Sequence, residues 1–152
     1  MFKTGDEAVR WIHSRKKFGS RPGLIRVNEL LKLCGHPEKN SIGIHIAGTN
    51  GKGSTVTYLR CLLEMQKLAV GTFTSPYIES FYERISINGK AISAEEFVQL
   101  ANEFRPLVDS MDEDTRYQGI TEFEILTAMA FSYFQKHADI AIFEAGIGGK
   151  WD

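Results

Sequence analysis

The segment His45-Ile-Ala-Gly-Thr-Asn-Gly-Lys-Gly-Ser-Thr55 decides the fold of this chain. A short apolar run, 42–47, leads into its glycines, and a stretch with helical character, 54–67, follows them. The order strand, glycine-rich loop, helix turns backbone N–H groups and a helix N-terminus toward an anion. Lys52 adds a point charge for the outer phosphates, and Ser54 adds a hydroxyl for magnesium. The segment therefore predicts a phosphate-binding loop for a nucleoside triphosphate.

This loop departs in two places from the common pattern G-x-x-x-x-G-K-[ST]. Ile46 stands where the pattern has its first glycine, and Gly53 follows the lysine, so the hydroxyl comes one residue later. A glycine-rich turn after a strand can also be no more than a tight turn. The anion-binding interpretation is favoured because the whole set agrees with it in one strand–helix context: Gly48, Gly51, Lys52, Gly53 and Ser54.

The composition indicates one globular domain. The chain has 152 residues, 43% of them hydrophobic and 24% charged, which is ordinary for a soluble protein with a single core. The net charge of −1 gives no electrostatic reason to expect a nucleic acid or a membrane as partner. Cys34 and Cys61 lack metal-ligand spacing, and we expect buried thiols in a reducing compartment. Because the N-terminus lacks the apolar core of a secretory signal, and no stretch is long enough to span a membrane, we expect a cytoplasmic protein.

Helical and strand-like segments alternate along the chain. Hydrophobic spacing and turn residues predict helices over 5–17, 24–34, 54–67, 93–109 and 121–137, and strands over 42–47, 68–74, 84–88 and 139–143. Capping-box patterns start the helices at Ser93 and Thr121, and Asn88-Gly89 indicates a hairpin turn. We therefore expect an α/β fold, an open and mainly parallel sheet of the P-loop NTPase type with helices on both faces. The glycine-rich end at Asp152 suggests that this fold is incomplete in the chain.

Two oxygen-bearing residues follow buried strands at the same predicted edge of the sheet. Glu144 ends the apolar run 140–143, the place of the carboxylate that holds magnesium in many P-loop enzymes. A strand-end carboxylate that only caps the next turn is the alternative. Ser75 ends the second strand and can offer a further oxygen to the metal, although a Ser-Pro pair usually just starts a turn.

Several aromatic residues and histidines allow a purely structural interpretation. Phe123 can belong to the core and Thr121 can be an N-cap and nothing more, and spacing does not decide between these readings and a binding role. His45 alternates with isoleucines in a strand, so we expect a hydrogen-bonded structural residue. The remaining histidines show no metal-ligand spacing: His13, His36 and His137.

Four motifs, in this order, resemble those of the folylpolyglutamate synthase/dihydrofolate synthase family, relatives of the Mur ligases. They are HIAGTNGKGST (45–55), TSPYIESFYERISING (74–89), TEFEILTAMAFSYF (121–134) and FEAGIGGKWD (143–152). The resemblance covers essentially the whole chain. It implies that residues 1–152 form the N-terminal portion of an ATP-binding domain of the Mur-ligase central-domain type. The rest of that domain and a C-terminal glutamate-binding domain would lie outside this chain.

The resemblance implies an ATP-dependent ligase that adds L-glutamate to the carboxylate of a folate or dihydropteroate through an acyl phosphate. ATP and Mg²⁺ are implied as co-substrate and cofactor. The implied partners are these small molecules, with no nucleic acid and no membrane, and the full-length enzyme is expected to be a monomer. A Mur-type or other P-loop ligase of a different acid is the alternative, and so is an inactive nucleotide-binding fragment. We expect the 152 residues alone to have no ligase activity.

The resemblance also implies roles for individual residues. The phosphates would lie against Thr49, Asn50, Gly51, Lys52, Gly53 and Ser54. Lys52 and Glu144 would be catalytic, and magnesium would be held by Ser75 and Glu144 with Ser54 nearby. The pterin would contact Thr121, Phe123 and Asp152, and segment 75–84 resembles a flexible loop beside both sites.

Two departures from the family pattern bear on substrate preference. Tyr77 stands where the family often has histidine. Lys150-Trp151 precede Asp152 where arginine and a small apolar residue are common. Because lysine does not replace arginine at a bidentate contact, these changes affect the expected substrate preference rather than the reaction class.

Overall fold

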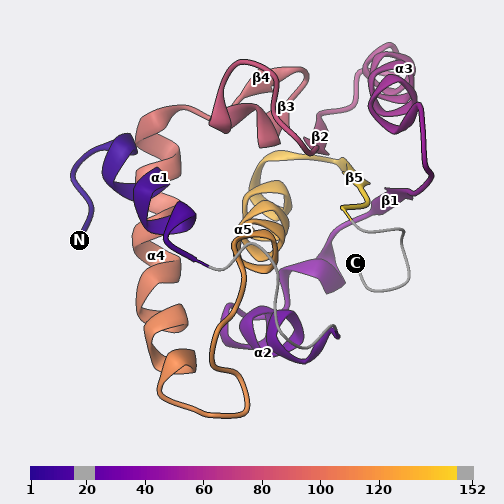
Figure 1. The fold of residues 1–152 in the computed structure, drawn as a ribbon. Coiled ribbons are helices and arrows are strands. Elements are labelled where there is room, and N and C mark those ends of the chain that lie inside the picture. The colour runs from indigo at the N-terminus through magenta and orange to yellow at the C-terminus, as the bar shows by residue number, and fades with distance from the viewer. Residues whose placement is uncertain (16–22, 147–152) are drawn as a thin grey trace.

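The computed structural model describes residues 1–15 and 23–146 (Figure 1). Its helices are α1 (Gly5–His13), α2 (Ile25–Leu33), α3 (Lys52–Glu64), α4 (Ala94–Asp112) and α5 (Glu122–His137). Its strands are β1 (Gly43–Ile46), β2 (Val70–Phe73), β3 (Ile85–Ile87), β4 (Lys90–Ala91) and β5 (Ile140–Glu144). Two short 3₁₀-helices, η1 (Pro37–Asn40) and η2 (Phe81–Arg84), precede β1 and β3.

The described strands form one sheet in the order β1-β5-β2-β3-β4. The first three are parallel, and β3 and β4 continue the sheet as an antiparallel hairpin beside β2. The last of the described strands, β5, lies between β1 and β2, and its run Ile-Ala-Ile-Phe is the continuous apolar pattern of a strand covered on both faces. The open, mainly parallel sheet predicted from the sequence is confirmed.

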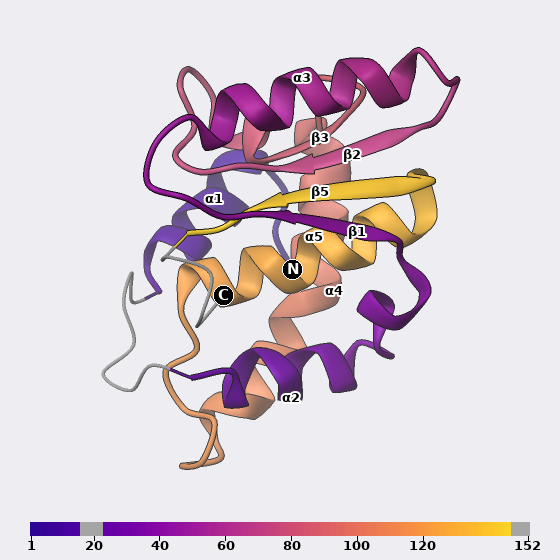
Figure 2. The ribbon, with the colours of Figure 1, turned by 90° about the vertical axis from the view of Figure 1, so that its right-hand side faces the viewer.

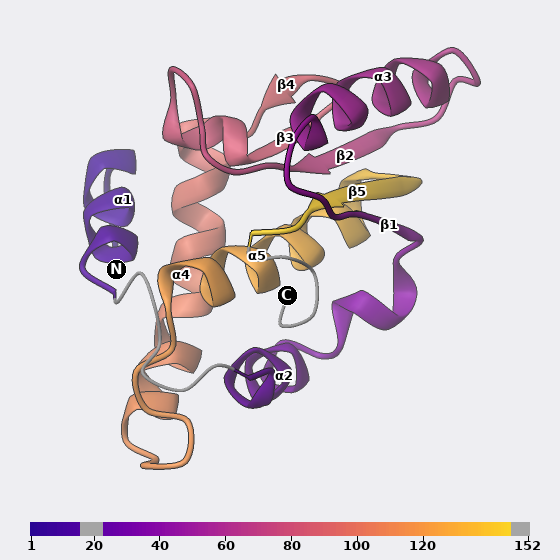
Figure 3. The same cartoon turned by 45° about the vertical axis from the view of Figure 1, so that its right-hand side comes forward.

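Helices cover both faces of the sheet. Figure 2 shows α3 alone on one face, and α5 on the other with α2 and α4 beyond it. Figure 3 shows α1 beside α4 and α2 beneath α5, in agreement with the packing of these pairs. The main core lies between the sheet and α5, and a smaller core under α3 is built on Val56, Val70 and Ile142.

Local signals set several of these boundaries as predicted. In both capping boxes the side chain of the cap, Ser93 or Thr121, accepts an N–H from the glutamate three residues later. That glutamate accepts the N–H of the cap in return. Asn88 and Gly89 have φ values of 50° and 73°, which is the left-handed geometry of a two-residue hairpin turn. This turn joins β3 to β4.

Other boundaries differ from the prediction. Helix α3 begins at Lys52 instead of residue 54, because Gly51 takes a φ of 76° as its N-cap. Helix α4 continues to Asp112, beyond the predicted end at residue 109, because burial of Met111 outweighs the polar sequence around it. Helix α1 ends at His13, short of the predicted residue 17.

The prediction of two buried cysteines is wrong for Cys61. This residue is exposed because it lies on α3, whose outer face is uncovered in the described part of the chain, whereas Cys34 is partly buried. Among the described residues, no helix combines the length and the apolar character that crossing a membrane requires.

Candidate functional site

The phosphate loop lies at the carboxyl end of a parallel strand. Strand β1 ends at Ile46 and α3 begins at Lys52, so five residues join them. Gly51 occupies the left-handed region, which glycine enters without the steric cost of a Cβ. The first turn of α3 carries no acidic side chain. Because the first N–H groups of a helix lack intrahelical partners, this end of α3 can receive an anion.

The side chain of Lys52 folds back over this loop. Its Nζ donates a hydrogen bond to the carbonyl oxygen of Gly48 at 3.0 Å. The ammonium group therefore lies beside the N-terminus of α3, where an anion held by the backbone amides would meet it.

Glu144 ends β5 at the same edge of the sheet. Glu144 is only 8% exposed, and in the parallel register of β1 and β5 it pairs with Ile46, the residue that leads into the phosphate loop. Oε2 of Glu144 accepts the backbone N–H of Ser75 at 3.1 Å. The sequence-predicted strand-end residues thus meet directly, as parallel strands of an open α/β sheet allow.

A cavity of about 640 Å³ lies between α3 and the segment that follows β2, and we call it the α3 cavity. Its lining residues are Gly53, Ser54, Thr57, Tyr58, Thr74, Ser75, Pro76, Tyr77, Ile78, Glu83 and Glu144. The structure therefore brings Ser54, Ser75 and Glu144 around one space. Hydroxyl and carboxylate oxygens are the ligands that Mg²⁺ prefers, and it usually takes only one or two carboxylates together with phosphates and water. This donor set fits magnesium.

Segment 75–84 forms the wall of the α3 cavity that faces α3. The carboxylate of Glu83 accepts backbone N–H groups from Ile78, Glu79 and Ser80 at 3.1, 3.3 and 3.1 Å. These bonds, that of Ile78 first, lower the pKa of the Glu83 carboxyl. The guanidinium of Arg84 lies 5.3 Å from the ring centre of Tyr77. The sequence analysis missed Glu83, although Ser80-Phe-Tyr-Glu83 is a third capping-box pattern and is formed in the structure.

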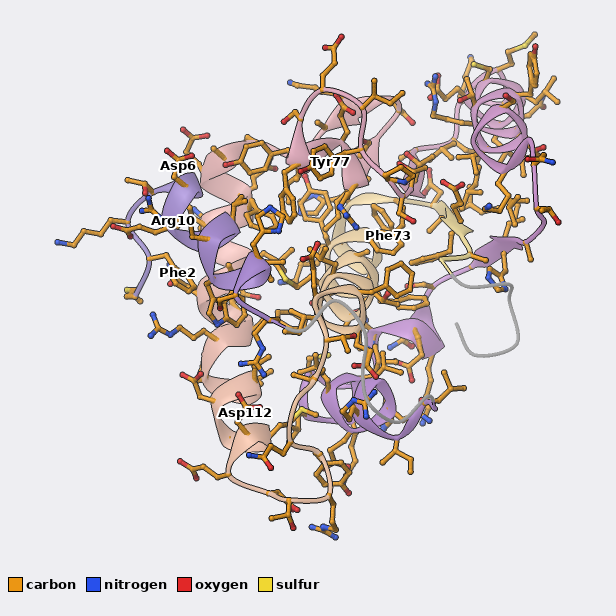
Figure 4. The ribbon with its side chains drawn as sticks, in the orientation of Figure 1. Phe2, Asp6, Arg10, Phe73, Tyr77 and Asp112 are labelled. Atoms are coloured by element: carbon orange, nitrogen blue, oxygen red, sulfur yellow. The ribbon has the colours of Figure 1, made fainter. Side chains whose placement is uncertain are left out.

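A second cavity, of about 280 Å³, lies on the other face of the sheet, and we call it the aromatic cavity. Its lining residues are Gly43, Ile44, His45, Phe73, Phe123, Thr127, Phe131, Phe143 and Glu144. The rings of Phe131 and Phe143 stack with their centres 4.2 Å apart. Figure 4 labels Phe73 beside β5 and α5, well apart from Asp6 and Arg10 on α1. Glu144 lines both cavities, so this carboxylate lies between them.

The other predicted site residues lie in different surroundings. Thr49 and Asn50 are exposed in the loop before α3. Phe123 is partly buried at the aromatic cavity. Thr121 is buried, and its hydroxyl donates to Oε2 of Glu124 at 2.8 Å within the capping box. Asp152 lies outside the described residues.

The expectation for His45 is wrong. This residue is exposed and lines the aromatic cavity, because β1 is an edge strand of the described sheet. The alternation of residues along β1 predicted a strand here. It could not show that this part of the face is left uncovered.

The sequence and structure comparisons with known proteins point to the same group of relatives. No protein-family model matches the chain. It is 51% identical over 154 residues to a dihydrofolate synthase/folylpolyglutamate synthase from Bacillus subtilis, a match that covers 100% of this chain and 36% of that protein. The crystal structure of folylpolyglutamate synthase from Thermotoga maritima matches with a TM-score of 0.90 and 37% identity, over 97% of this chain and 34% of that one. A complex of such a synthase with AMPPCP and folate matches with a TM-score of 0.92 and 36% identity, over 99% of this chain and 37% of that one.

These matches extend along nearly all of the chain and along only part of each relative. The chain spans about a third of the length of the proteins that it matches.

Proposed function

We propose that the chain, which belongs to the folylpolyglutamate synthase/dihydrofolate synthase family and spans about a third of the length of its relatives, carries the ATP- and magnesium-binding part of a folate ligase. The reaction would join L-glutamate to the carboxylate of a folate or a dihydropteroate. One observation supports this proposal most directly. The N-terminus of α3, Ser54, Ser75 and Glu144 surround the α3 cavity, and Glu144 also lines an aromatic cavity large enough for part of an organic acid.

The chemistry explains why these groups are needed together. A carboxylate is a poor electrophile until its oxygen takes the terminal phosphoryl group of ATP, with ADP as leaving group. The amino group of glutamate then attacks the acyl carbon, and inorganic phosphate leaves. Two anions meet in the first step, so fixed positive charge must neutralise them.

Lys52 and the first-turn amides of α3 would hold the transferred phosphoryl group, with Thr49, Asn50, Gly51 and Gly53 shaping the loop around the phosphates. Ser54, Ser75 and Glu144 would hold Mg²⁺, which supplies charge neutralisation at the phosphate oxygens when bound. The Ser75 N–H that donates to Glu144 fixes one carboxylate oxygen, and this bond orients the proposed ligand.

The aromatic cavity supports a flat ring as part of the acid substrate. Phe123 lines it together with three other phenylalanines, and aromatic side chains favour stacking against a planar heterocycle. This lining favours a pterin acid over the sugar acid of a Mur-type ligase. The assignments of Thr121 and Asp152 to the pterin rest on the family resemblance, and the hydroxyl of Thr121 also serves its helix cap.

The same proposal includes the arrangement of the whole protein. Residues 1–152 would be the N-terminal portion of the ATP-binding domain, and a glutamate-binding domain would belong to a longer protein. The complete enzyme would act as a cytoplasmic monomer on small molecules, without nucleic acid or membrane partners.

The experiment that tests the proposal titrates the chain with ATP by calorimetry, with and without Mg²⁺. We expect binding that depends on Mg²⁺. Binding that ignores the metal would contradict the proposed magnesium ligands, and no binding at all would contradict the nucleotide site. In a protein that also contains the glutamate-binding domain, glutamate-dependent phosphate release would be compared for dihydropteroate, tetrahydrofolate and a UDP-muramyl acid. Stimulation by the muramyl acid alone would show that the substrate class is wrong.

A further inference from the structure

Segment 75–84 is a loop whose two ends are closed by backbone contacts. Thr74 donates its N–H to the carbonyl oxygen of Arg84 at 3.2 Å, where β2 and β3 begin to pair. The loop is tied to the proposed metal site at one point near its start, through the bond from Ser75 N–H to Glu144. Farther along, Phe81 is buried against Phe97 and His13. The shape of residues 78–80, which lie between these two attachments, therefore depends on contacts within the loop.

Glu83 supplies those contacts. Its two carboxylate oxygens accept the N–H groups of three successive residues, Ile78, Glu79 and Ser80. Successive N–H groups that converge on one anion make a concave backbone arrangement, which here is filled by the protein's own carboxylate. The same side chain lines the α3 cavity together with Ser75, Tyr77 and Ile78. One residue thus fixes the backbone of a wall of that cavity.

We propose that Glu83 is a positioning residue for the phosphate and magnesium site, an inference that rests on the proposed function. By holding the backbone of residues 78–80, the carboxylate keeps this wall of the α3 cavity in place and keeps Ser75 against Glu144. Without Glu83, three backbone N–H groups lose their acceptor and the wall reorganises, so magnesium-dependent ATP binding weakens. Groups that orient metal ligands from outside the coordination shell commonly have effects of about 10–100-fold on metal affinity.

The sign of the effect separates positioning from simple electrostatics. Glu83 is an anion beside a cavity proposed to hold a triphosphate, and removing a negative charge there favours an anionic ligand. An effect of charge alone would therefore tighten ATP binding. An effect of loop position weakens it.

The test compares Glu83→Ala, Glu83→Gln and the matched control Glu79→Gln in the chain. Glu79 is an exposed carboxylate of the same loop, so its replacement removes the same charge and keeps the carboxylate of Glu83. The measurements are the ATP affinity at saturating Mg²⁺, the Mg²⁺ concentration that gives half-maximal ATP binding, and the melting temperature of each variant. We expect this concentration to rise roughly tenfold for Glu83→Ala. A smaller rise is expected for Glu83→Gln, whose amide oxygen still accepts, and no rise for Glu79→Gln.

Each outcome bears on the proposal. If Glu83→Ala lowers the melting temperature but leaves the Mg²⁺ dependence unchanged, Glu83 only caps η2 and the inference is wrong. Equal shifts in Glu83→Gln and Glu79→Gln would show a charge effect and would also overturn it. Failure of the wild-type chain to bind ATP refutes the proposed function, and the inference with it. An unchanged Glu83→Ala in a chain that binds ATP refutes the inference alone.

Discussion

The two faces of the central sheet are packed in different ways. On one face, α5 lies between the sheet and the helices α1, α2 and α4, and most of its side chains are buried. On the other face, α3 is the one helix of the described residues that packs against the sheet, and Val56 is the buried residue that it has there. Tyr58 and Leu62 on this helix are 73 and 62% exposed, and Met65, which caps its C-terminal end, is 76% exposed. The face that stabilises the described fold is therefore opposite the face that carries the phosphate loop.

This difference follows from the two helix sequences. The run EFEILTAMAFSYF in α5 is apolar nearly all round, as in helices buried on every side. Helix α3 begins with small and polar residues that shape the loop and the α3 cavity. It has fewer apolar residues packed against the sheet than α5 has. Stability and ligand binding are thus separated by the sheet, so a variant on one face can be expected to affect one property and spare the other.

The largest effect on stability is expected for Phe134→Ala. Phe134 is 1% exposed, and its ring lies so close to Gly71 that a Cβ there would come within 2.6 Å of it. Removal of the ring leaves a cavity and lowers the free energy of unfolding by about 3–5 kcal/mol. Val56→Ala, its counterpart under α3, should cost roughly 2 kcal/mol. Urea denaturation measures both, and equal losses would break the comparison between the faces.

For Lys52→Ala we expect a large effect on catalysis and a small effect on stability. In a protein that also contains the glutamate-binding domain, we expect phosphoryl transfer to slow by roughly 100-fold or more. The reason is that one preorganised charge on a developing anion contributes about 3 kcal/mol. The free energy of unfolding should change by less than about 0.5 kcal/mol, since Lys52 lies outside the core. Single-turnover kinetics and urea denaturation separate the two. The control is Lys39→Ala, because Lys39 lies in η1, which precedes the opposite end of β1. Near-wild-type turnover of Lys52→Ala would contradict the proposed role of Lys52.

The sequence predicted best those features that depend on neighbouring residues. The glycine-rich loop before α3, the hairpin at Asn88-Gly89 and the boxes at Ser93 and Thr121 lie where local patterns put them. The third box, which begins at Ser80, has the same pattern and was missed. It opens a four-residue 3₁₀-helix and not an apolar helix with a visible period.

Features that depend on distant segments were harder to predict. Nothing near β5 in the sequence shows that it lies between β1 and β2. The exposure of His45 depends on which strand stands at the edge of the sheet, and the exposure of Cys61 depends on what covers α3. The strand-end positions of Ser75 and Glu144 were predictable because parallel strands share an edge. The roles in ligand binding assigned from the resemblance stay predictions.

A smaller effect is expected for Thr121→Ala, which sharpens the comparison at the start of α5. Loss of the cap should lower the free energy of unfolding by about 1 kcal/mol. Ser93→Ala at the start of α4 is the matched control, because Ser93 caps its helix through the same reciprocal bonds. If Thr121 also contacts the acid substrate, its variant alone raises the KM for that acid in the longer protein. Equal stability losses with an unchanged KM would restrict Thr121 to its structural role.

The smallest effect on stability is expected for Met65→Lys at the C-terminal end of α3. Met65 is 76% exposed, so lysine places its charge in water and the free energy of unfolding should change by less than about 0.5 kcal/mol. Met129→Lys on α5 is the counterpart, and there a charge would enter a fully buried position at a cost of several kcal/mol. Thermal denaturation measures the loss of stability of each variant and so compares the same substitution on the two faces of the sheet. A large loss from Met65→Lys would mean that the C-terminal end of α3 is covered in solution, and this would contradict the contrast between the two faces.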